Sequence, residues 1–168
     1  IMQVVMDETG KPIQEAMSME IYSAIDSLAF YAKRAPKWLK DESRSMHGPM
    51  QFLKKTKVAF KPRGVIGVIT PWNGPFILSI NPAIQAVLAG NSVIIKPSEV
   101  TPKSGMLVEE MFKKADAPDN LVQVLIGDGQ VGADLINLKP DKVSFTGSIK
   151  TGKLIARQCG ESLIPFSL

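Results

Sequence analysis

Residues 64–75 read Gly-Val-Ile-Gly-Val-Ile-Thr-Pro-Trp-Asn-Gly-Pro and join an apolar, β-branched run to a turn with a proline on either side. A run of Val and Ile without polar alternation is typical of a parallel strand that is buried on both faces. Proline fixes φ and removes a backbone donor, so Pro71 and Pro75 restrict the turn between them to few conformations. We therefore expect a buried strand over 65–69 that ends in a rigid turn carrying Asn73.

The same alternation of an apolar run with a helical stretch continues towards the C-terminus. Strands are expected at 65–69, 92–96, 121–126 and 142–145, and helices at 77–89, 103–115, 131–138 and 148–159. Strands that alternate with helices are typical of parallel βαβ winding. The sequence thus predicts an α/β fold with a Rossmann-like, doubly wound parallel sheet.

The first 63 residues follow a different pattern. Apolar residues at helical spacing predict an amphipathic helix, and they are Ile13, Met17, Ile21, Ile25, Leu28 and Ala32. Residues 40–50 are polar and predict an exposed loop, whereas 52–63 alternate and predict a half-exposed strand or hairpin arm. We divide the chain into an N-terminal helical segment with a strand arm, 1–63, and a Rossmann-like domain, 64–168. The last apolar run has no helix after it, so we expect this domain to be incomplete.

Composition and charge exclude several classes of partner and of binding site. The chain is 45% hydrophobic and 21% charged, which is ordinary for a globular protein with a sizeable core. Its net charge of +4 comes without a zinc-finger, RNP or helix-turn-helix pattern, so we expect a solvated face and no nucleic-acid partner. The single cysteine excludes an internal disulfide and a multi-cysteine metal site, and it favours a reducing, cytoplasmic location. Polar residues interrupt the apolar stretch 76–95, and no signal peptide opens the chain, so we expect no membrane segment.

The turn after the first strand places an amide where ligands bind to parallel sheets, beyond the carboxyl ends of the strands. The side chain of Asn73 has two N–H donors, which suit the stabilisation of an oxyanion. The alternative is a strand-ending turn in which Asn73 serves only as a local cap. Trp72 borders this candidate site, and a packing role is the alternative for it.

A second expected strand runs into Lys96-Pro97-Ser98-Glu99. A Lys and a Glu at such a position are suited to hydrogen-bond the vicinal hydroxyls of a ribose. An acidic residue there disfavours a 2′-phosphate, so NAD would be preferred over NADP. The alternative is a surface Lys and a Glu whose charge complements the dipole of the next helix.

A third expected strand runs through Phe145-Thr146-Gly147-Ser148 directly into a helix, with Gly152 one turn in. Small residues there let a phosphate approach backbone N–H groups at the helix N-terminus. The spacing is neither GxGxxG nor a P-loop, and the alternative is Ser148 as an N-cap with Gly152 as a packing glycine. Gly127 ends another strand and is expected to contribute a turn near the same crevice.

The remaining reactive side chains do not form a catalytic pair. Cys159 falls late in a helical stretch, away from any strand end, so we expect a structural thiol. His47 is the only histidine and lies in the polar loop, which argues against Cys–His and Ser–His catalysis. No group of residues suggests a metal site.

Taken together, the three strand ends resemble the aldehyde dehydrogenase superfamily, over about residues 58–168. The resemblance is carried by Phe60-Lys-Pro-Arg-Gly-Val-Ile-Gly67 with the Pro-Trp-Asn turn, by Ala89-Gly-Asn-Ser-Val-Ile-Ile-Lys-Pro-Ser-Glu-Val-Thr-Pro102, and by Phe145-Thr-Gly-Ser148. It implies the oxidation of a small-molecule aldehyde to a carboxylic acid with hydride transfer to NAD, or to NADP. It also implies a homodimer or homotetramer in which the strand arm belongs to the oligomerisation region.

The resemblance also implies roles for single residues. Asn73 would hold the oxyanion of the thiohemiacetal, and Trp72 would line the cofactor crevice. Lys96 and Glu99 would bind the adenosine ribose, with Ser98 between them in the cofactor-binding set. Ser148 and Gly147 would contact the pyrophosphate at the helix N-terminus, and Gly127 and Gly152 complete the expected cofactor-binding set.

In family members a cysteine thiolate attacks the aldehyde, and a glutamate in a Glu-Leu-Gly-Gly motif activates water. Neither matches a position in this chain, and Cys159 does not match the catalytic cysteine, so we expect the isolated chain not to turn over. Two alternatives stay open. One is a CoA-acylating semialdehyde dehydrogenase or an acyl reductase of the same fold. The other is a non-catalytic binding or assembly module whose arm, 52–63, pairs with a partner strand.

Overall fold

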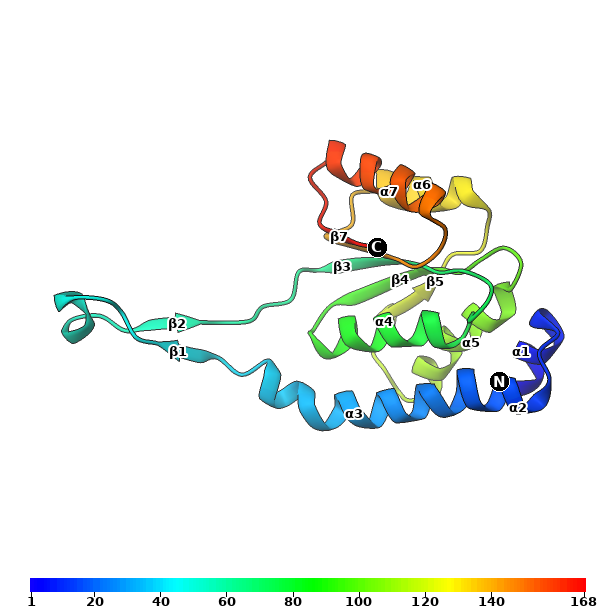
Figure 1. Cartoon of the computed structure of the whole chain (residues 1–168), viewed down its shortest axis with the longest axis horizontal. Helices are drawn as coiled ribbons and strands as arrows, with labels where there is room; N and C mark the ends of the chain where they lie inside the picture. Colours follow the sequence, from blue (N-terminus) through cyan, green and yellow to red (C-terminus); the bar gives the residue numbers. More distant parts are fainter.

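The computed structural model describes all 168 residues and has a parallel sheet at its centre (Figure 1). The strands lie in the order β5-β4-β3-β6-β7, and every neighbouring pair is parallel. Their bounds are β3 Val65–Ile69, β4 Ser92–Lys96, β5 Val122–Val124, β6 Lys142–Phe145 and β7 Phe166–Ser167. The predicted α/β fold with a doubly wound sheet is therefore confirmed. The expected strand at 121–126 is shorter than predicted, and the other three have the predicted bounds.

Two helices cover each face of the sheet (Figure 1). Helices α4 (Ile77–Leu88) and α5 (Pro102–Lys114) pack on one face, and α6 (Gly129–Asn137) and α7 (Ile149–Glu161) pack on the other. The sheet separates two hydrophobic clusters, because the side chains of a parallel strand alternate between its faces. Val68, Val93 and Val143 at its centre are completely buried.

The N-terminal helices form a further layer outside α4 and α5 (Figure 1). They are α1 (Met2–Thr9), α2 (Ile13–Glu15), a π-helical segment η1 (Ala16–Tyr22) and α3 (Ser23–Trp38). The predicted amphipathic helix corresponds to α2, η1 and α3, which follow one another without a break. Val5, Ala16 and Ala24 are buried in the same cluster as α4 and α5, so this layer belongs to the core of that face.

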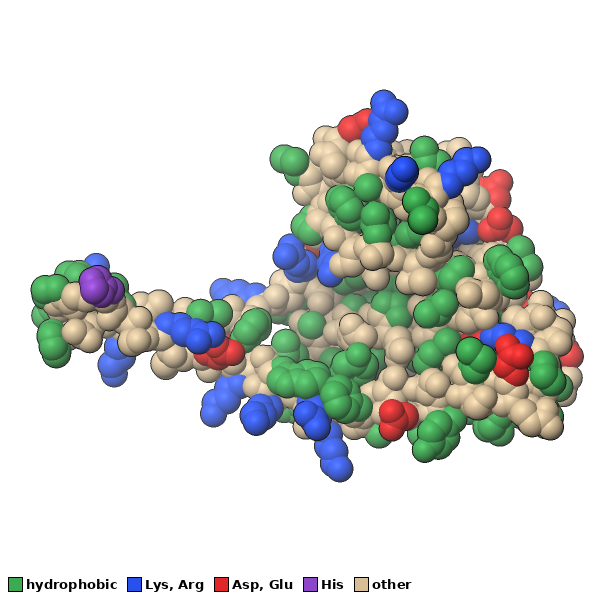
Figure 2. Space-filling view, in the orientation of Figure 1, with side chains coloured by type: hydrophobic (Ala, Val, Ile, Leu, Met, Phe, Trp, Pro, Cys, Tyr) green, Lys and Arg blue, Asp and Glu red, His purple; other side chains and the backbone are tan.

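A two-stranded arm projects from the body beyond α3 (Figures 1 and 2). Strands β1 (Glu42–Arg44) and β2 (Thr56–Val58) pair antiparallel, and a 3-10 turn, η2 (Pro49–Phe52), lies at the tip. The expectation of a loop over 40–50 was therefore wrong for β1, whose three exposed side chains show no alternation that sequence periodicity could detect. None of the helices combines the length and hydropathy that crossing a membrane requires.

Candidate functional site

A cleft of about 550 Å³ opens at the carboxyl ends of β3, β4 and β6. The chain leaves β3 towards β4 and β5 on one side and reaches β6 and β7 on the other, so β3 and β6 flank the point where the winding reverses. Ligands of doubly wound sheets bind at this point. Six of the residues singled out from sequence line the cleft, namely Trp72, Lys96, Ser98, Glu99, Gly147 and Ser148.

Lys96 and Glu99 form an ion pair on one side of the cleft. The Lys96 ammonium lies 3.3 Å from Glu99 Oε2; the Lys96 side chain is 5% exposed, whereas that of Glu99 is 56% exposed. The lysine stem passes over Gly132 of α6, where a Cβ would lie 3.7 Å from Lys96 Cδ. A buried ammonium is thus held at the floor of the cleft, with a carboxylate at its rim.

The environment of Glu99 favours its charged form. A hydrogen bond from its own backbone N–H lowers the pKa of the Glu99 carboxyl, and Lys96 acts in the same direction. Glu99 does not cap the next helix, because Glu8 of α1 accepts the N–H groups of Lys103 and Ser104 at 2.8 and 2.7 Å. The carboxylate of Glu99 is therefore available to a ligand. Ser98 is 8% exposed, and its hydroxyl accepts the N–H of Val100, which fixes the turn between Lys96 and α5.

The N-terminus of α7 forms the other side of the cleft. Ser148 Oγ accepts the N–H of Thr151 at 3.2 Å, so the N-cap alternative is confirmed for this side chain. Gly147 passes so close to the ring of Phe145 that a Cβ would lie 2.5 Å from Phe145 Cζ. A side chain at position 147 would displace that ring, so glycine keeps the backbone of this strand end open to the cleft.

Two predicted glycines do not line the cleft. Gly152 is buried, and a Cβ there would lie 3.5 Å from Phe145 Cε1, which fits the packing alternative. A Cβ at Gly127 would lie 2.3 Å from Val131 Cγ2, so this glycine allows the turn into α6 to close. Their contribution to the cleft is indirect, through the positions of α6 and α7.

Asn73 lies in the turn beyond β3, outside the lining of the cleft, while Trp72 stands at its edge with 57% of its surface exposed. The amide side chain of Asn73 is exposed and makes no hydrogen bond within the chain, so it is not a local cap. The N-terminus of α4 is capped instead by Glu20, whose Oε2 accepts the N–H groups of Phe76 and Ile77 at 3.2 and 2.9 Å. Both donors of the Asn73 amide therefore remain free.

Sequence reasoning missed Gln158 and the start of α6. Gln158 lines the cleft, and its Nε2 donates to the carbonyl of Ala133 at 2.9 Å and to Asn137 Oδ1 at 2.7 Å, which ties α7 to α6. Gly129, Gly132 and Ala133 present small residues to the cleft. Their i, i+3, i+4 spacing places them on one helix face, and this was the signal available in the sequence.

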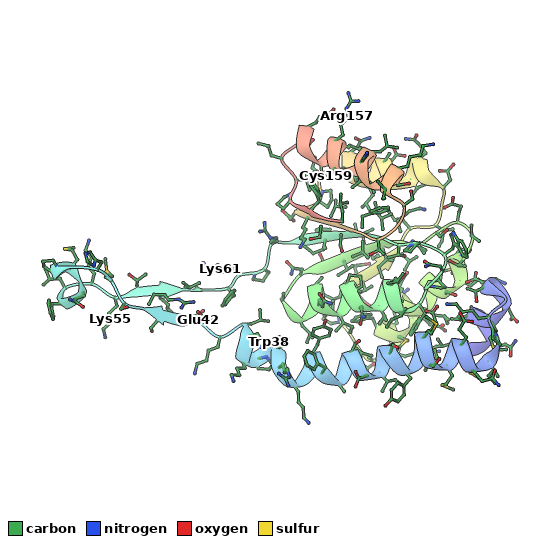
Figure 3. All side chains as sticks on the ribbon, in the orientation of Figure 1. Trp38, Glu42, Lys55, Lys61, Arg157 and Cys159 are labelled. Atoms are coloured by element: carbon green, nitrogen blue, oxygen red, sulfur yellow. The ribbon has the colours of Figure 1, made fainter.

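Cys159 lies on α7 between that helix and the sheet (Figure 3) and is completely buried in the hydrophobic cluster. Burial raises the pKa of its thiol, which keeps the thiol neutral and unreactive near pH 7. It does not line the cleft. No three His, Cys, Asp or Glu side chains converge as a metal ligand set.

The sequence of the whole chain is similar to that of a known protein family. The sequence profile described as "Aldehyde dehydrogenase family" matches residues 1–168. The chain belongs to the aldehyde dehydrogenase family. This assignment agrees with the parallel sheet and with the position of the cleft.

Individual aldehyde dehydrogenase relatives are similar over nearly the whole chain. A 4,4'-diapolycopene aldehyde oxidase of Methylomonas sp is 46% identical over 161 residues, which is 95% of this chain and 30% of the relative. A protein of Mycolicibacterium smegmatis, provisionally named succinate-semialdehyde dehydrogenase (NADP+), is 40% identical over 99% of this chain and 32% of its own length. The chain thus spans about a third of the length of the curated relatives it matches.

Solved aldehyde dehydrogenase structures have the same fold. In the NAD+ complex of an aldehyde dehydrogenase from Bacillus cereus, the matching region is 31% identical and superimposes with a TM-score of 0.89. The match covers 98% of this chain and 33% of the solved chain. The N-terminal helices and the arm are therefore included in the similarity, together with the sheet.

Proposed function

We propose that the whole protein is an NAD(P)-dependent aldehyde dehydrogenase that oxidises an aldehyde to a carboxylic acid. In this proposal the chain supplies the cofactor cleft and one hydrogen-bond donor of the catalytic site. The observation that carries it is the cleft at the reversal point of the sheet, with the Lys96–Glu99 pair on one side and the N-terminus of α7 on the other. Its volume is in the range of small-molecule and cofactor sites.

The residues in the cleft fit a nicotinamide dinucleotide. The Glu99 carboxylate and the Lys96 ammonium would bind ribose hydroxyls, the first as an acceptor and the second as a donor. The backbone at Gly147 and Ser148 would receive the pyrophosphate, because glycine leaves room there and free N–H groups point out of a helix N-terminus. The cofactor, when bound, accepts a hydride. Trp72 and Thr70 at the end of β3 border the same space.

We propose that Asn73 stabilises the oxyanion formed when a thiolate attacks the aldehyde. Its amide donors are free, while the turn that carries them is fixed by its prolines and by hydrogen bonds to its backbone. Cys159 is not the nucleophile in this proposal, because it is buried, its thiol is kept neutral, and it does not line the cleft. Thiolate and water-activating base would come from the part of the relatives' length that this chain does not cover. The isolated chain is then expected not to turn over.

We propose that NAD is preferred over NADP. An ionised carboxylate at the ribose repels a 2′-phosphate, and the pKa of Glu99 is lowered. Calorimetric titration of the full-length protein should give tighter binding of NAD than of NADP. Glu99→Ala should weaken the binding of NAD about 10- to 100-fold, since a hydrogen bond to a charged group is worth about 1.5–3 kcal/mol. The affinity of the unchanged protein should stay level from pH 8 to pH 5 and fall only below the ordinary carboxyl pKa of 4.5.

Glu110→Ala is the matched control for this titration, because Glu110 is an exposed glutamate on α5 that pairs with Lys114 away from the cleft. It should leave NAD affinity unchanged. Tighter binding of NADP, or equal effects of the two substitutions, would contradict the proposed role of Glu99.

We also propose that the arm mediates a homodimer or homotetramer. Phe52 and Leu53 near its tip are 84% and 80% exposed, and apolar side chains gather there beside the single histidine (Figure 2). Side chains of this size are seldom left in water by a monomer, and unpaired strand edges favour association. The double substitution Phe52→Glu, Leu53→Glu should shift the full-length protein to a smaller species in light scattering. An unchanged molar mass would exclude the arm tip from the interface.

A further inference from the structure

A buried ion pair lies behind the turn that carries Asn73. The ammonium of Lys11, in the connection between α1 and α2, binds Glu20 Oε1 of η1. The side chains are 11% and 1% exposed, respectively, so the carboxylate is completely buried and the lysine is largely covered. Charges are rarely buried unless they are paired and hydrogen-bonded, and such a pair seldom adds net stability. The cost of burying it calls for an explanation other than packing.

The carboxylate of Glu20 holds the start of α4. While Oε1 binds Lys11, Oε2 accepts the N–H groups of Phe76 and Ile77, the two residues that follow Pro75. Glu20 reaches this position from a π-helical segment, a rare geometry that occurs frequently at functional sites. The first residues of α4 are thereby fixed by a side chain 56 positions earlier in the sequence.

The ammonium of Lys11 holds the turn itself. Besides Glu20, it donates to the backbone carbonyl of Asn73 at 2.7 Å. The backbone of Asn73 is thus anchored by Lys11, and three residues later, at Phe76, the chain is anchored by Glu20. None of these bonds uses the Asn73 side chain, whose amide stays free and exposed.

We propose that Lys11 and Glu20 are positioning residues that aim the Asn73 amide at the reacting oxygen. This inference rests on the proposed function, in which Asn73 stabilises an oxyanion. Such donors act only when they are preorganised at the position where charge develops, and a displacement of about 1 Å can cost about 100-fold in rate. An ion pair that binds the backbone at Asn73 and just after the turn supplies this preorganisation without occupying the donors.

A double-mutant cycle on the full-length protein tests the proposal. Lys11→Met keeps the length of the side chain but removes the donor to the Asn73 carbonyl. It should lower kcat about 10- to 100-fold while leaving the calorimetric affinity for NAD(P) and the KM for the aldehyde within about twofold, since an interaction made only in the transition state affects kcat. In an Asn73→Ala background the same substitution should change kcat less than about twofold. Lys11→Arg, which keeps a charged donor, should restore most of the rate.

A merely structural role predicts a different set of results. Removing one partner of the pair lowers the thermal midpoint in either case. With a merely structural role, however, Lys11→Met would leave kcat per active site unchanged, and any loss of rate would multiply with that of Asn73→Ala. Glu20→Gln gives a second measurement, because it keeps the size and an acceptor at Phe76 and Ile77. It should lower kcat in the same non-additive way, and faster amide exchange at these two residues should report the loosened turn.

Each outcome decides the question. Non-additive losses of kcat with Lys11→Met and Glu20→Gln support the proposal. Multiplicative losses, or an unchanged kcat in folded variants, overturn it. Failure of the proposed function can be distinguished from failure of this inference. If the full-length protein oxidises no aldehyde, or if its Asn73→Ala variant keeps the full rate, Asn73 itself does not have the proposed role. The control is Lys114→Met on the exposed face of α5, which should leave kcat and the cycle unchanged.

Discussion

Replacing Asn73 with alanine should lower the kcat of the full-length protein about 10²- to 10³-fold, which is the usual cost of one oxyanion donor. The expectation follows from the structure of the turn, in which the amide makes no bond of its own and α4 is capped by Glu20. Since the exposed side chain makes no hydrogen bond that the substitution would remove, the thermal midpoint should change little. Steady-state kinetics with a saturating cofactor, together with a thermal melt, measures both quantities.

Asn73→Asp is the matched variant for this experiment, because it keeps the shape of the side chain and removes both N–H donors. It should lose at least as much rate as Asn73→Ala, since a carboxylate repels the developing negative charge. NAD(P) affinity should be retained by both variants, because Asn73 lies outside the lining of the cleft. A kcat within about threefold of the unchanged protein would assign the oxyanion to another group.

The fold could be predicted largely because the sheet is parallel and buried. Continuous Val and Ile runs mark β3 and β4 to the residue, since helices cover both faces of the sheet. Strand β6 reads Lys-Val-Ser-Phe and alternates instead, and its bounds also agree with the prediction. The arm was predicted less completely. Strand β1 exposes every side chain, so burial imposes no pattern on Glu42, Ser43 and Arg44. Its pairing with β2 is made by the antiparallel backbone ladder, beside the ion pair of Lys57 with Asp41.

In the candidate site, too, some residues could be predicted from the sequence and others could not. Lys96 ends a predicted strand, and Glu99, Gly147 and Ser148 follow predicted strands within three residues. The topology of the sheet brings the ends of these strands to one cleft. The residues that hold the helix starts follow no such rule. Glu8 caps α5 from 96 positions away, and Glu20 caps α4 from 56 positions away. Such long-range bonds leave no local spacing, so only the packing of the N-terminal layer shows which carboxylate serves which helix.

The network behind Asn73 should also dominate the local stability of the chain. Glu20 is completely buried and satisfies three groups, the Lys11 ammonium and the N–H groups of Phe76 and Ile77. Removing one partner of a buried pair leaves an uncompensated charge, whereas removing both partners avoids that penalty. The cost of a substitution at Glu20 therefore depends on what remains at Lys11.

Glu20→Ala should reduce the free energy of unfolding by about 3–5 kcal/mol, the cost of breaking a buried pair. With about 2–3 kcal/mol per molar urea, the denaturation midpoint should fall by about 1–2.5 M. Glu110→Ala removes an exposed partner of Lys114 and should cost under about 0.5 kcal/mol.

In the Lys11→Met background, Glu20→Gln should cost less stability than it does alone, because no buried ammonium is left unpaired. If Glu20→Ala shifts the midpoint no more than Glu110→Ala, the carboxylate does not hold α4. If instead the double variant regains stability without regaining kcat, the pair serves the turn and not the core.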